Sequence, residues 1–202
     1  MKMLNHGFQS KLLRVDLSQR GVSLETLDAA LLRRHLGGVS LGARLLYDLS
    51  PPRTGWDDPE NPVILLSGPL GGTQVMGSGT ICLCTRGAMT GGATSTQANG
   101  FLGAYLRHAG YDGLVIQGSA ESLSYLHITD AGAEIRDAAH LAGRDTWQTE
   151  AALRAELGGG QMSVFCIGPA GENRVRFAAL VGDSGHVAAH NGPGAVLGAK
   201  NL

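Results

Sequence analysis

The sequence predicts an α+β domain, β-rich, in which mixed and largely antiparallel sheets outweigh the helices. Several apolar segments of strand length are separated only by short polar or glycine-containing turns. Such turns join antiparallel neighbours, whereas parallel pairing needs a long crossover. The helical stripes are few and do not alternate regularly with strands, as they would in a doubly wound fold. Glycine supplies 31 of the 202 residues, about twice its usual share, which indicates backbone that turns tightly or closely approaches a ligand.

Composition excludes several classes of function. Hydrophobic residues make up 43% of the chain and the formal net charge is −1, so no basic surface is expected for nucleic acid or acidic membranes. The sequence has no run of the roughly 20 apolar residues that a membrane-spanning helix needs. Charges scattered through the start of the chain (MKMLNHGFQSKLLRVDL) argue against a signal peptide. Three cysteines form no disulfide framework, and we expect a cytoplasmic protein.

Two strands and two helices are expected first along the chain. The strands are short amphipathic runs joined by a polar turn. The first helix follows Asp28, a candidate N-cap, and ends at Gly37-Gly38, while the second continues as a leucine stripe. The predicted elements are strands at 11–16 and 22–27, helices within 28–36 and 41–46, and a surface loop at 50–62.

Two apolar runs in the middle of the chain predict buried strands, PVILLSG (62–68) and TICLCT (80–85). Cys82 and Cys84 are two residues apart in the second run, so strand geometry points both side chains to one face. We interpret them as small core residues rather than metal ligands.

The second half of the chain predicts further strands and two helices. Helical spacing over 101–109 ends at Gly110. Asp145 and Gln148 can form a capping box for a helix that runs through Leu157. The predicted strands lie at 114–118, 124–129, 133–137, 163–168 and 175–180.

Three glycine-rich segments lie next to predicted strand ends or helix starts, at 68–80, 90–113 and 185–201. Such backbone exposes N–H groups that can surround phosphates or other anionic oxygens. Two familiar phosphate motifs are missing, because GPLGGT lacks the Gly-Lys-Ser/Thr of a P-loop and no GxGxxG joins a strand to a helix. No GxSxG hydrolase motif occurs.

The same blocks, in order, resemble the N-terminal domain of the aldehyde ferredoxin oxidoreductase family. They are KLLRVDLSQRGV, GPLGGT, QANGFLGAYLRHAGYDGLVIQG, AEIRDAAHLAGRDTWQTE, IGPAGEN and GHVAAHNGPGAVLGAKNL. The resemblance covers about residues 7–202, so we treat 1–202 as one domain of this type. It implies two similar β-rich halves.

The resemblance also implies a cofactor, a tungsten or molybdenum bis-pterin whose phosphates are bridged by magnesium. The domain would form the base on which this cofactor lies, with no catalytic residue of its own. By position, Gln97 and Ala188 would offer backbone carbonyls to magnesium. The implied cofactor-binding residues are Thr80, Gln97, Asn99, Gly100, Val187, Ala188, His190 and Asn191.

The sequence departs from the family pattern in charge. The family has arginines at the positions of Thr80 and Val187, and another in the last glycine loop near His190-Asn191. Arginines suit pterin phosphates. His190, Asn191 and Arg86 are candidates for partial compensation. The alternative of zinc at His186 and His190, four residues apart, is less favoured because no third ligand is evident.

Other partners follow from the resemblance alone. The family binds an iron–sulfur cluster in later domains, and Cys82, Cys84 and Cys166 cannot supply four cluster ligands. We therefore expect further domains or a subunit with the cluster, an aldehyde or related carbonyl substrate, and a ferredoxin-like electron carrier. This chain alone is not expected to be active, and an uncovered cofactor face could drive homo-oligomer formation. The alternatives are a catalytically incomplete binding module or partner subunit, a fragment of a longer protein, and an unrelated structural or flavin-binding protein.

Overall fold

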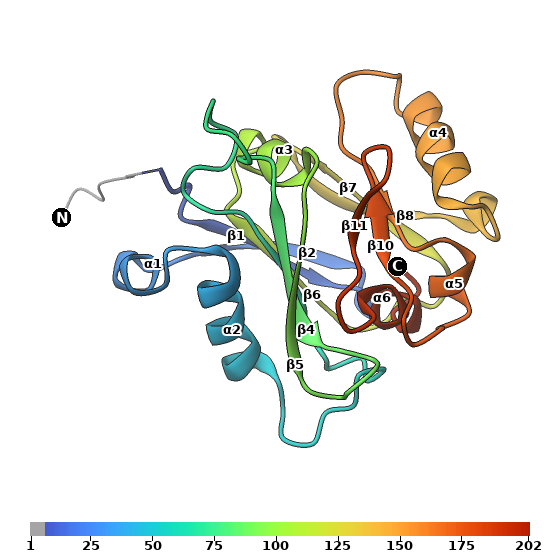
Figure 1. Ribbon diagram of the computed structural model, residues 1–202, viewed down its shortest axis with the longest axis horizontal. Coiled ribbons are helices and arrows are strands. Elements are labelled where there is room, and N and C mark those ends of the chain that lie inside the picture. The colour runs from blue at the N-terminus through green and yellow to red at the C-terminus, as the bar shows by residue number, and fades with distance from the viewer. Residues whose placement is uncertain (1–6) are drawn as a thin grey trace.

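A six-stranded sheet organises the computed structural model, which describes residues 7–202 (Figure 1). The strand order is β2-β1-β6-β3-β4-β5; β1 and β6 pair in parallel, and the other neighbours are antiparallel. The first six residues, on which the signal-peptide argument partly rests, lie outside the described residues. The strands are β1 (Lys11–Asp16), β2 (Gly21–Thr26), β3 (Val63–Leu66), β4 (Ile81–Arg86), β5 (Ala93–Ala98) and β6 (Gly113–Gln117).

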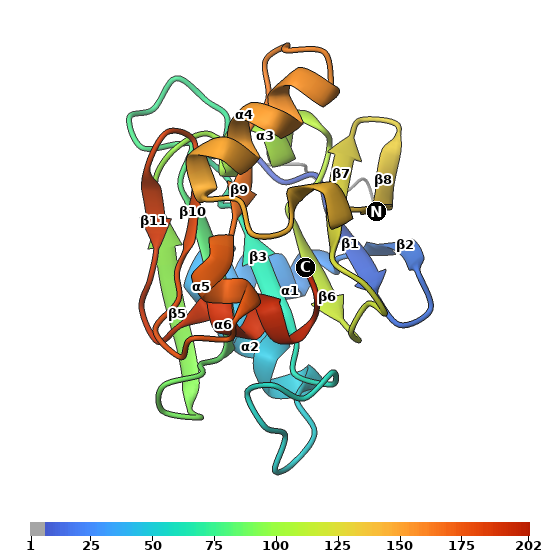
Figure 2. The same ribbon diagram turned by 90° about the vertical axis from the view of Figure 1, so that its right-hand side faces the viewer.

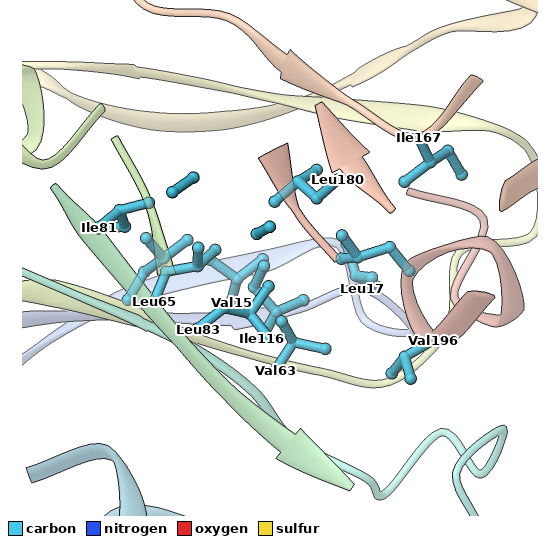
Figure 3. Packing of buried hydrophobic residues seen from close by; sticks show 14 of the residues in the cluster. Val15, Leu17, Val63, Leu65, Ile81, Leu83, Ile116, Ile167, Leu180 and Val196 are labelled. Atoms are coloured by element: carbon cyan, nitrogen blue, oxygen red, sulfur yellow. The ribbon is translucent and has the colours of Figure 1, made fainter. Parts of the chain in front are cut away.

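Alternation along the strands divides the core between the two faces of this sheet. On one face, Ile64 and Leu66 of β3 join Cys82 and Cys84 of β4 in a cluster under the helices. These helices are α1 (Ala29–His35) and α2 (Gly38–Leu49), and α2 packs directly on β3 and β4. On the other face, Leu65 belongs to the larger cluster shown in Figure 3.

The C-terminal part of the chain covers this second face. Leu180 and Val196 lie in one cluster with Val15, Leu83 and Ile116 of the sheet (Figure 3). The covering elements are a three-stranded sheet of order β11-β10-β9 and two short helices, α5 and α6. Their bounds are β9 (Phe165–Cys166), α5 (Gly168–Glu172), β10 (Leu180–Gly182), β11 (His186–Ala188) and α6 (Pro193–Ala199).

The remaining elements surround these two parts: α4 packs against β9 and β10, and the β7–β8 hairpin contacts β2. The N-cap residue of α4, Asp145, accepts from the backbone N–H of Gln148, whose side chain accepts from the N–H of Asp145, so the predicted capping box is confirmed. The elements are α3 (Leu102–His108), the hairpin of β7 (Ser124–Thr129) and β8 (Gly132–Asp137), a 3-10 turn at Ala139–Leu141, and α4 (Thr146–Glu156).

The α+β class with mixed and antiparallel sheet is confirmed, and so are the elements predicted between 11 and 157. Two later predictions are wrong in extent. Only Phe165–Cys166 of the run 163–168 is strand, and 175–180 is turn up to the start of β10 at Leu180. Ile167 and Ala178 are buried by packing in the cluster on the large sheet rather than by strand pairing, and Phe177 is exposed. Between residues 7 and 202, no helix is long and apolar enough to cross a membrane.

Five elements were not expected: β5, β11, α5, α6 and the 3-10 turn at Ala139–Leu141. The residues of β5 (ATSTQA) are small or polar, so they give no hydrophobic period, although Thr94, Thr96 and Ala98 alternate inward. Helix α6 (PGAVLGA) is buried throughout, although its sequence alone predicts a glycine-rich loop. A Cβ at Gly198 would lie 1.9 Å from the carbonyl oxygen of Gly171, so glycine permits α6 to pack on α5 backbone to backbone.

The two strand cysteines lie in the core, as predicted. Cys82 and Cys84 are 4% and 1% exposed, and their sulfur atoms are 3.8 Å apart. The hydrogen bond with Cys82, together with burial, raises the pKa of the Cys84 thiol. Among the described residues no group of three or more His, Cys, Asp or Glu side chains is placed to hold a metal ion.

Lys200, at the end of α6, is a charged residue in the protein interior. It is 1% exposed, and its Nζ donates to the carbonyl oxygens of Pro59 (2.9 Å) and Gly118 (3.1 Å). These bonds join α6 to the 50–62 loop and to the end of β6. Burial lowers the pKa of Lys200 to about 8, against the opposing effect of Asp58 and Glu60.

The lowered pKa predicts that Lys200 makes stability rise with pH. Below about pH 8 both states hold the proton, whereas between the folded pKa and the ordinary value of 10.5 the unfolded chain binds more protons. The free energy of unfolding should therefore rise by on the order of 3 kcal/mol at most across this window. Denaturant titrations from pH 7.5 to 10 should show this rise relative to Lys200→Met. Lys11→Met, which removes an exposed lysine, is the control, and an equal rise in Lys200→Met would contradict the assignment.

Candidate functional site

An open pocket of about 460 Å³ lies between the first glycine segment and the start of α3. Four glycines line it together with hydroxyl, amide and imidazole side chains. Thr80 and Asn99 meet there, because the Thr80 hydroxyl donates to Asn99 Oδ1 over 3.1 Å. The lining residues are Gly72, Thr73, Gly77, Ser78, Gly79, Thr80, Asn99, Gly100, Phe101, Ala104 and His108.

Glycine is required where the first two glycine segments meet. A Cβ at Gly79 would lie 1.9 Å from the carbonyl oxygen of Gly100. Gly100 has a φ of +100°, and a Cβ there would lie 2.8 Å from Asp183 Oδ2. Gly100 therefore lines the pocket on one side and accommodates the Asp183 carboxylate on the other, so a larger residue would disturb the packing as well as the pocket.

The third glycine segment reaches the site through an edge-to-edge contact of two strands. β5 is the edge strand of the large sheet, β11 is the edge strand of the small one, and they pack against each other (Figure 2). Gln97 lies exposed on β5, Val187 is 46% exposed on β11, and Ala188 beside it is buried. An edge strand leaves alternate backbone carbonyls outside its ladder.

The loop after β11 lies farther along β5, towards the β4–β5 turn. The His190 N–H donates to the Thr96 hydroxyl over 3.3 Å. Asn191 Oδ1 accepts from the Thr90 N–H over 3.1 Å, and its Nδ2 donates to the Thr90 hydroxyl over 2.8 Å. Asn191 therefore fastens two loops together. The structure thus gathers Thr80, Asn99 and Gly100 at the pocket, while the other expected residues are spread along β5 and β11.

Positive charge is scarce around the pocket. His108 is the basic residue among its lining residues, and its Nε2 lies 3.0 Å from the Gly72 carbonyl oxygen. Arg107, on the same helix, is buried in an ion pair with Asp112 and donates to the Gly7 carbonyl. Arg86 donates to the Gly91 carbonyl at the β4–β5 turn (3.4 Å) rather than lining the pocket.

Two further residues lie next to the site: Asp183, which was not singled out from the sequence, and His186, which was considered only as a zinc ligand. Asp183 is 6% exposed and contacts Gly100 and Phe101, and the His186 ring lies close to Gly100. His186 is on β11 and His190 is in the following loop, so the helical spacing considered for zinc is absent. The signal available for Asp183 was its place in the turn-like sequence Gly-Asp-Ser-Gly, which carries no information about a partner 82 residues away.

The fold and pocket define an α+β domain whose glycine-rich loops frame an open polar site. The profile of the aldehyde ferredoxin oxidoreductase N-terminal domain matches residues 12–202. The tungsten-containing aldehyde ferredoxin oxidoreductase of Pyrococcus furiosus is 39% identical over 197 residues, which cover 98% of this chain and 33% of that protein. The chain therefore belongs to the aldehyde ferredoxin oxidoreductase family, as its N-terminal domain, and the resemblance found in the sequence is confirmed.

Two further relatives have different names. The aliphatic sulfonate oxidoreductase, WOR-like subunit, of Pyrococcus furiosus is 34% identical over 212 residues, covering 98% of this chain and 34% of that protein. A solved structure, the active site complex BamBC of benzoyl coenzyme A reductase in complex with 1,5-dienoyl-CoA, is similar with a TM-score of 0.94 and 33% identity. The match covers 97% of this chain and 30% of that chain. The chain thus spans about a third of the length of these relatives.

The contacts and backbone conformation of Asn191 predict which of two variants, Asn191→Ala or Asn191→Gly, is the less stable. Asn191 has a φ of +66°, so alanine there would lose both hydrogen bonds and strain the backbone. Asn191→Ala should lower the free energy of unfolding by roughly 2–3 kcal/mol, and Asn191→Gly by about 1 kcal/mol less. Urea unfolding measures both.

The matched control for Asn191 is Asn173, which ends α5 with a φ of −82°. At that position alanine should be at least as stable as glycine, since no left-handed conformation is required. If alanine is also the more stable replacement at Asn191, the proposed role of its backbone conformation is wrong.

Proposed function

We propose that this chain forms the base of a tungsten- or molybdenum-pterin site in an oxidoreductase. The observation that carries the proposal is the pocket lined by the first two glycine segments, with the edge strands β5 and β11 side by side next to it. Glycine backbone allows the close approach that a large, flat anionic group requires. The tungsten-containing relatives from Pyrococcus and Thermococcus support the choice of cofactor.

The residues present fit such a group through backbone and hydroxyl contacts. A Cβ at Gly77 would meet no atom within 4 Å, so the backbone there is open to a ligand. Thr80, Asn99 and Gly100 would contact the pterin side, and Val187 and His190 would contribute from the last segment. Asn191, whose amide is bonded to Thr90, would contribute by holding the loop of that segment in place. Gln97 and Ala188 lie on edge strands, where free carbonyl oxygens suit magnesium. The cofactor supplies the redox chemistry, and this chain positions it.

The working enzyme would need more than this domain. Apolar side chains stand exposed around the pocket, among them Val75, Met76 and Phe101, which are 52%, 99% and 59% exposed. These exposed side chains favour the proposal that this face packs against further domains or a subunit. Those domains or that subunit would hold the iron–sulfur cluster and pass electrons to a ferredoxin-like carrier. A self-association of this face is the other outcome of the same exposure.

An aldehyde or related carbonyl compound is our proposed substrate. The relatives named above are an aldehyde oxidoreductase, a sulfonate oxidoreductase and a benzoyl coenzyme A reductase, so the family accommodates several substrate classes. The higher identity to the aldehyde enzymes favours the aldehyde.

A second candidate function is a binding module or partner subunit that is catalytically incomplete. The specific observation in its favour is that Thr80 and Val187 stand where arginines are expected and that no Lys or Arg among residues 7–202 lines the pocket. Cofactor content of the protein purified without oxygen from its native host distinguishes the two. Tungsten or molybdenum with pterin near one site per chain supports the first proposal, and neither metal nor pterin would reject it.

The missing charges predict that added arginines strengthen retention. Thr80→Arg with Val187→Arg should raise the pterin retained after dialysis by roughly tenfold, because each new guanidinium can pair with a phosphate. Oxidised-pterin fluorescence gives the content per chain. The control, Leu24→Arg with Val39→Arg, adds the same charge at exposed positions on β2 and α2. An equal gain in both proteins would mean that net charge rather than the site is responsible.

A further inference from the structure

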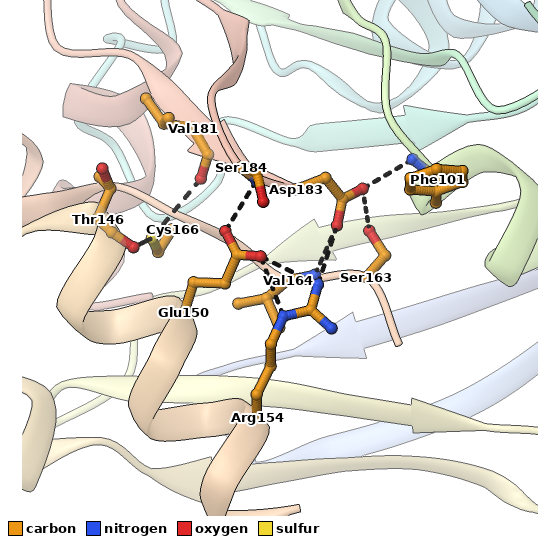
Figure 4. Close-up of polar contacts among 10 residues, drawn as sticks. All are labelled: Phe101, Thr146, Glu150, Arg154, Ser163, Val164, Cys166, Val181, Asp183 and Ser184. Carbon is orange, nitrogen blue, oxygen red and sulfur yellow. Dashed lines mark hydrogen bonds and ion pairs between the residues drawn. The ribbon is translucent and has the colours of Figure 1, made fainter. Parts of the chain in front are cut away.

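The Asp183 carboxylate joins three separate segments of the chain (Figure 4). Oδ2 accepts from the Phe101 N–H over 2.7 Å and from the Ser163 hydroxyl over 2.7 Å. Oδ1 accepts from the Val164 N–H over 3.2 Å. Phe101 is the N-cap residue of α3 and follows directly on Gly100, so this one carboxylate reaches the backbone of the pocket wall.

The backbone around Asp183 is fixed as tightly as its side chain. Asp183 and Ser184 have φ values of 46° and 65° in the turn between β10 and β11. The Asp183 N–H donates to the Val164 carbonyl over 3.1 Å, and the Gly185 N–H closes the turn on the Gly182 carbonyl over 3.1 Å. The side chain is therefore held at the start of the third glycine segment and directed at the second.

Two side chains of helix α4, Glu150 and Arg154, contact the β10–β11 turn. Glu150 is 8% exposed, and its Oε2 accepts from the Ser184 N–H over 3.0 Å. The Arg154 guanidinium donates to Glu150 Oε1 over 3.0 Å and lies 3.8 Å from Asp183 Oδ1 (Figure 4). One arginine thus lies between two buried carboxylates, and α4 is connected to the β10–β11 turn.

We propose that Asp183 is a positioning residue for the cofactor site: it sets the position of the Asn99–Phe101 backbone relative to β11, and Arg154 holds Asp183 in place. The inference rests on the proposed function, because its consequence is the retention of pterin between these two segments. Asp183 is not among the residues that line the pocket; it acts through the N–H of Phe101 and through the space that Gly100 leaves for it.

The test compares Asp183→Asn with the wild-type protein. Asparagine keeps the shape, and Arg154 next to Oδ1 favours the orientation in which the amide oxygen still accepts from the Val164 N–H. The NH₂ group then takes the place of Oδ2, where it can donate to the Ser163 hydroxyl but faces the Phe101 N–H, so that one bond is lost. We expect the pterin content per folded chain to fall by roughly tenfold. Hydrogen exchange should become faster in the peptide that spans residues 97–104. Asp130→Asn, at an exposed turn, is the matched control and should change neither.

A second pair of variants guards against a failure of Asp183→Asn to fold. Arg154 is partly exposed, and Arg154→Met leaves Asp183 and its hydrogen bonds to the backbone in place. It should lower pterin content by about threefold, and Arg154→Lys should restore part of it. A residue with only a structural role would shift the melting temperature and leave the pterin content per folded chain unchanged.

The outcomes separate the inference from the function on which it rests. Pterin lost from Asp183→Asn or Arg154→Met, with faster exchange at 97–104, supports the inference. If the wild-type protein holds pterin and these variants hold it equally well, the inference is wrong and the proposed function stands. If the wild-type protein holds none, the proposed function fails and the inference fails with it.

Discussion

The structure depends on the contact between two edge strands that are far apart in the chain. β5 is an edge strand of the large sheet, and β11 is an edge strand of the small one. At the end of their contact that is nearest the pocket, the Asp183 carboxylate accepts a hydrogen bond from the Phe101 N–H. Burying that carboxylate is favourable only because several N–H and O–H donors and Arg154 satisfy it. The same contact brings the start of the third glycine-rich segment next to the second.

Glycine content follows from this close packing. At Gly79 against Gly100, and at Gly198 against Gly171, a Cβ would lie 1.9 Å from a carbonyl oxygen, far inside van der Waals contact. Much of the glycine therefore serves backbone-to-backbone packing, and a smaller part, as at Gly77, leaves backbone open at the pocket. Composition alone cannot separate these two uses, because both require the absence of a side chain.

The sequence was most informative where hydrophobic period and capping chemistry agree. The hairpin of β1 and β2, the buried strands β3 and β4, and the box of Asp145 and Gln148 could all be predicted locally. β5 and α6 could not, because their residues are small and are placed by tertiary packing. For the site, the family resemblance supplied Thr80, Asn99 and Gly100, which meet at the pocket, whereas Asp183 could not be found without its distant partners.

The family membership and the scarcity of cations at the pocket together motivate the proposed contribution of this domain. In the proposed function, a base that would hold an anionic cofactor through backbone and hydroxyl groups needs its loops in fixed positions, since fewer charges compensate for poor geometry. The most direct measurement is therefore the hydrogen exchange of the Phe101 amide in the wild-type protein, followed by NMR. The account predicts exchange slowed by orders of magnitude relative to an unstructured peptide, because this N–H is bonded to a buried carboxylate. Exchange at the rate of an unstructured peptide would contradict it.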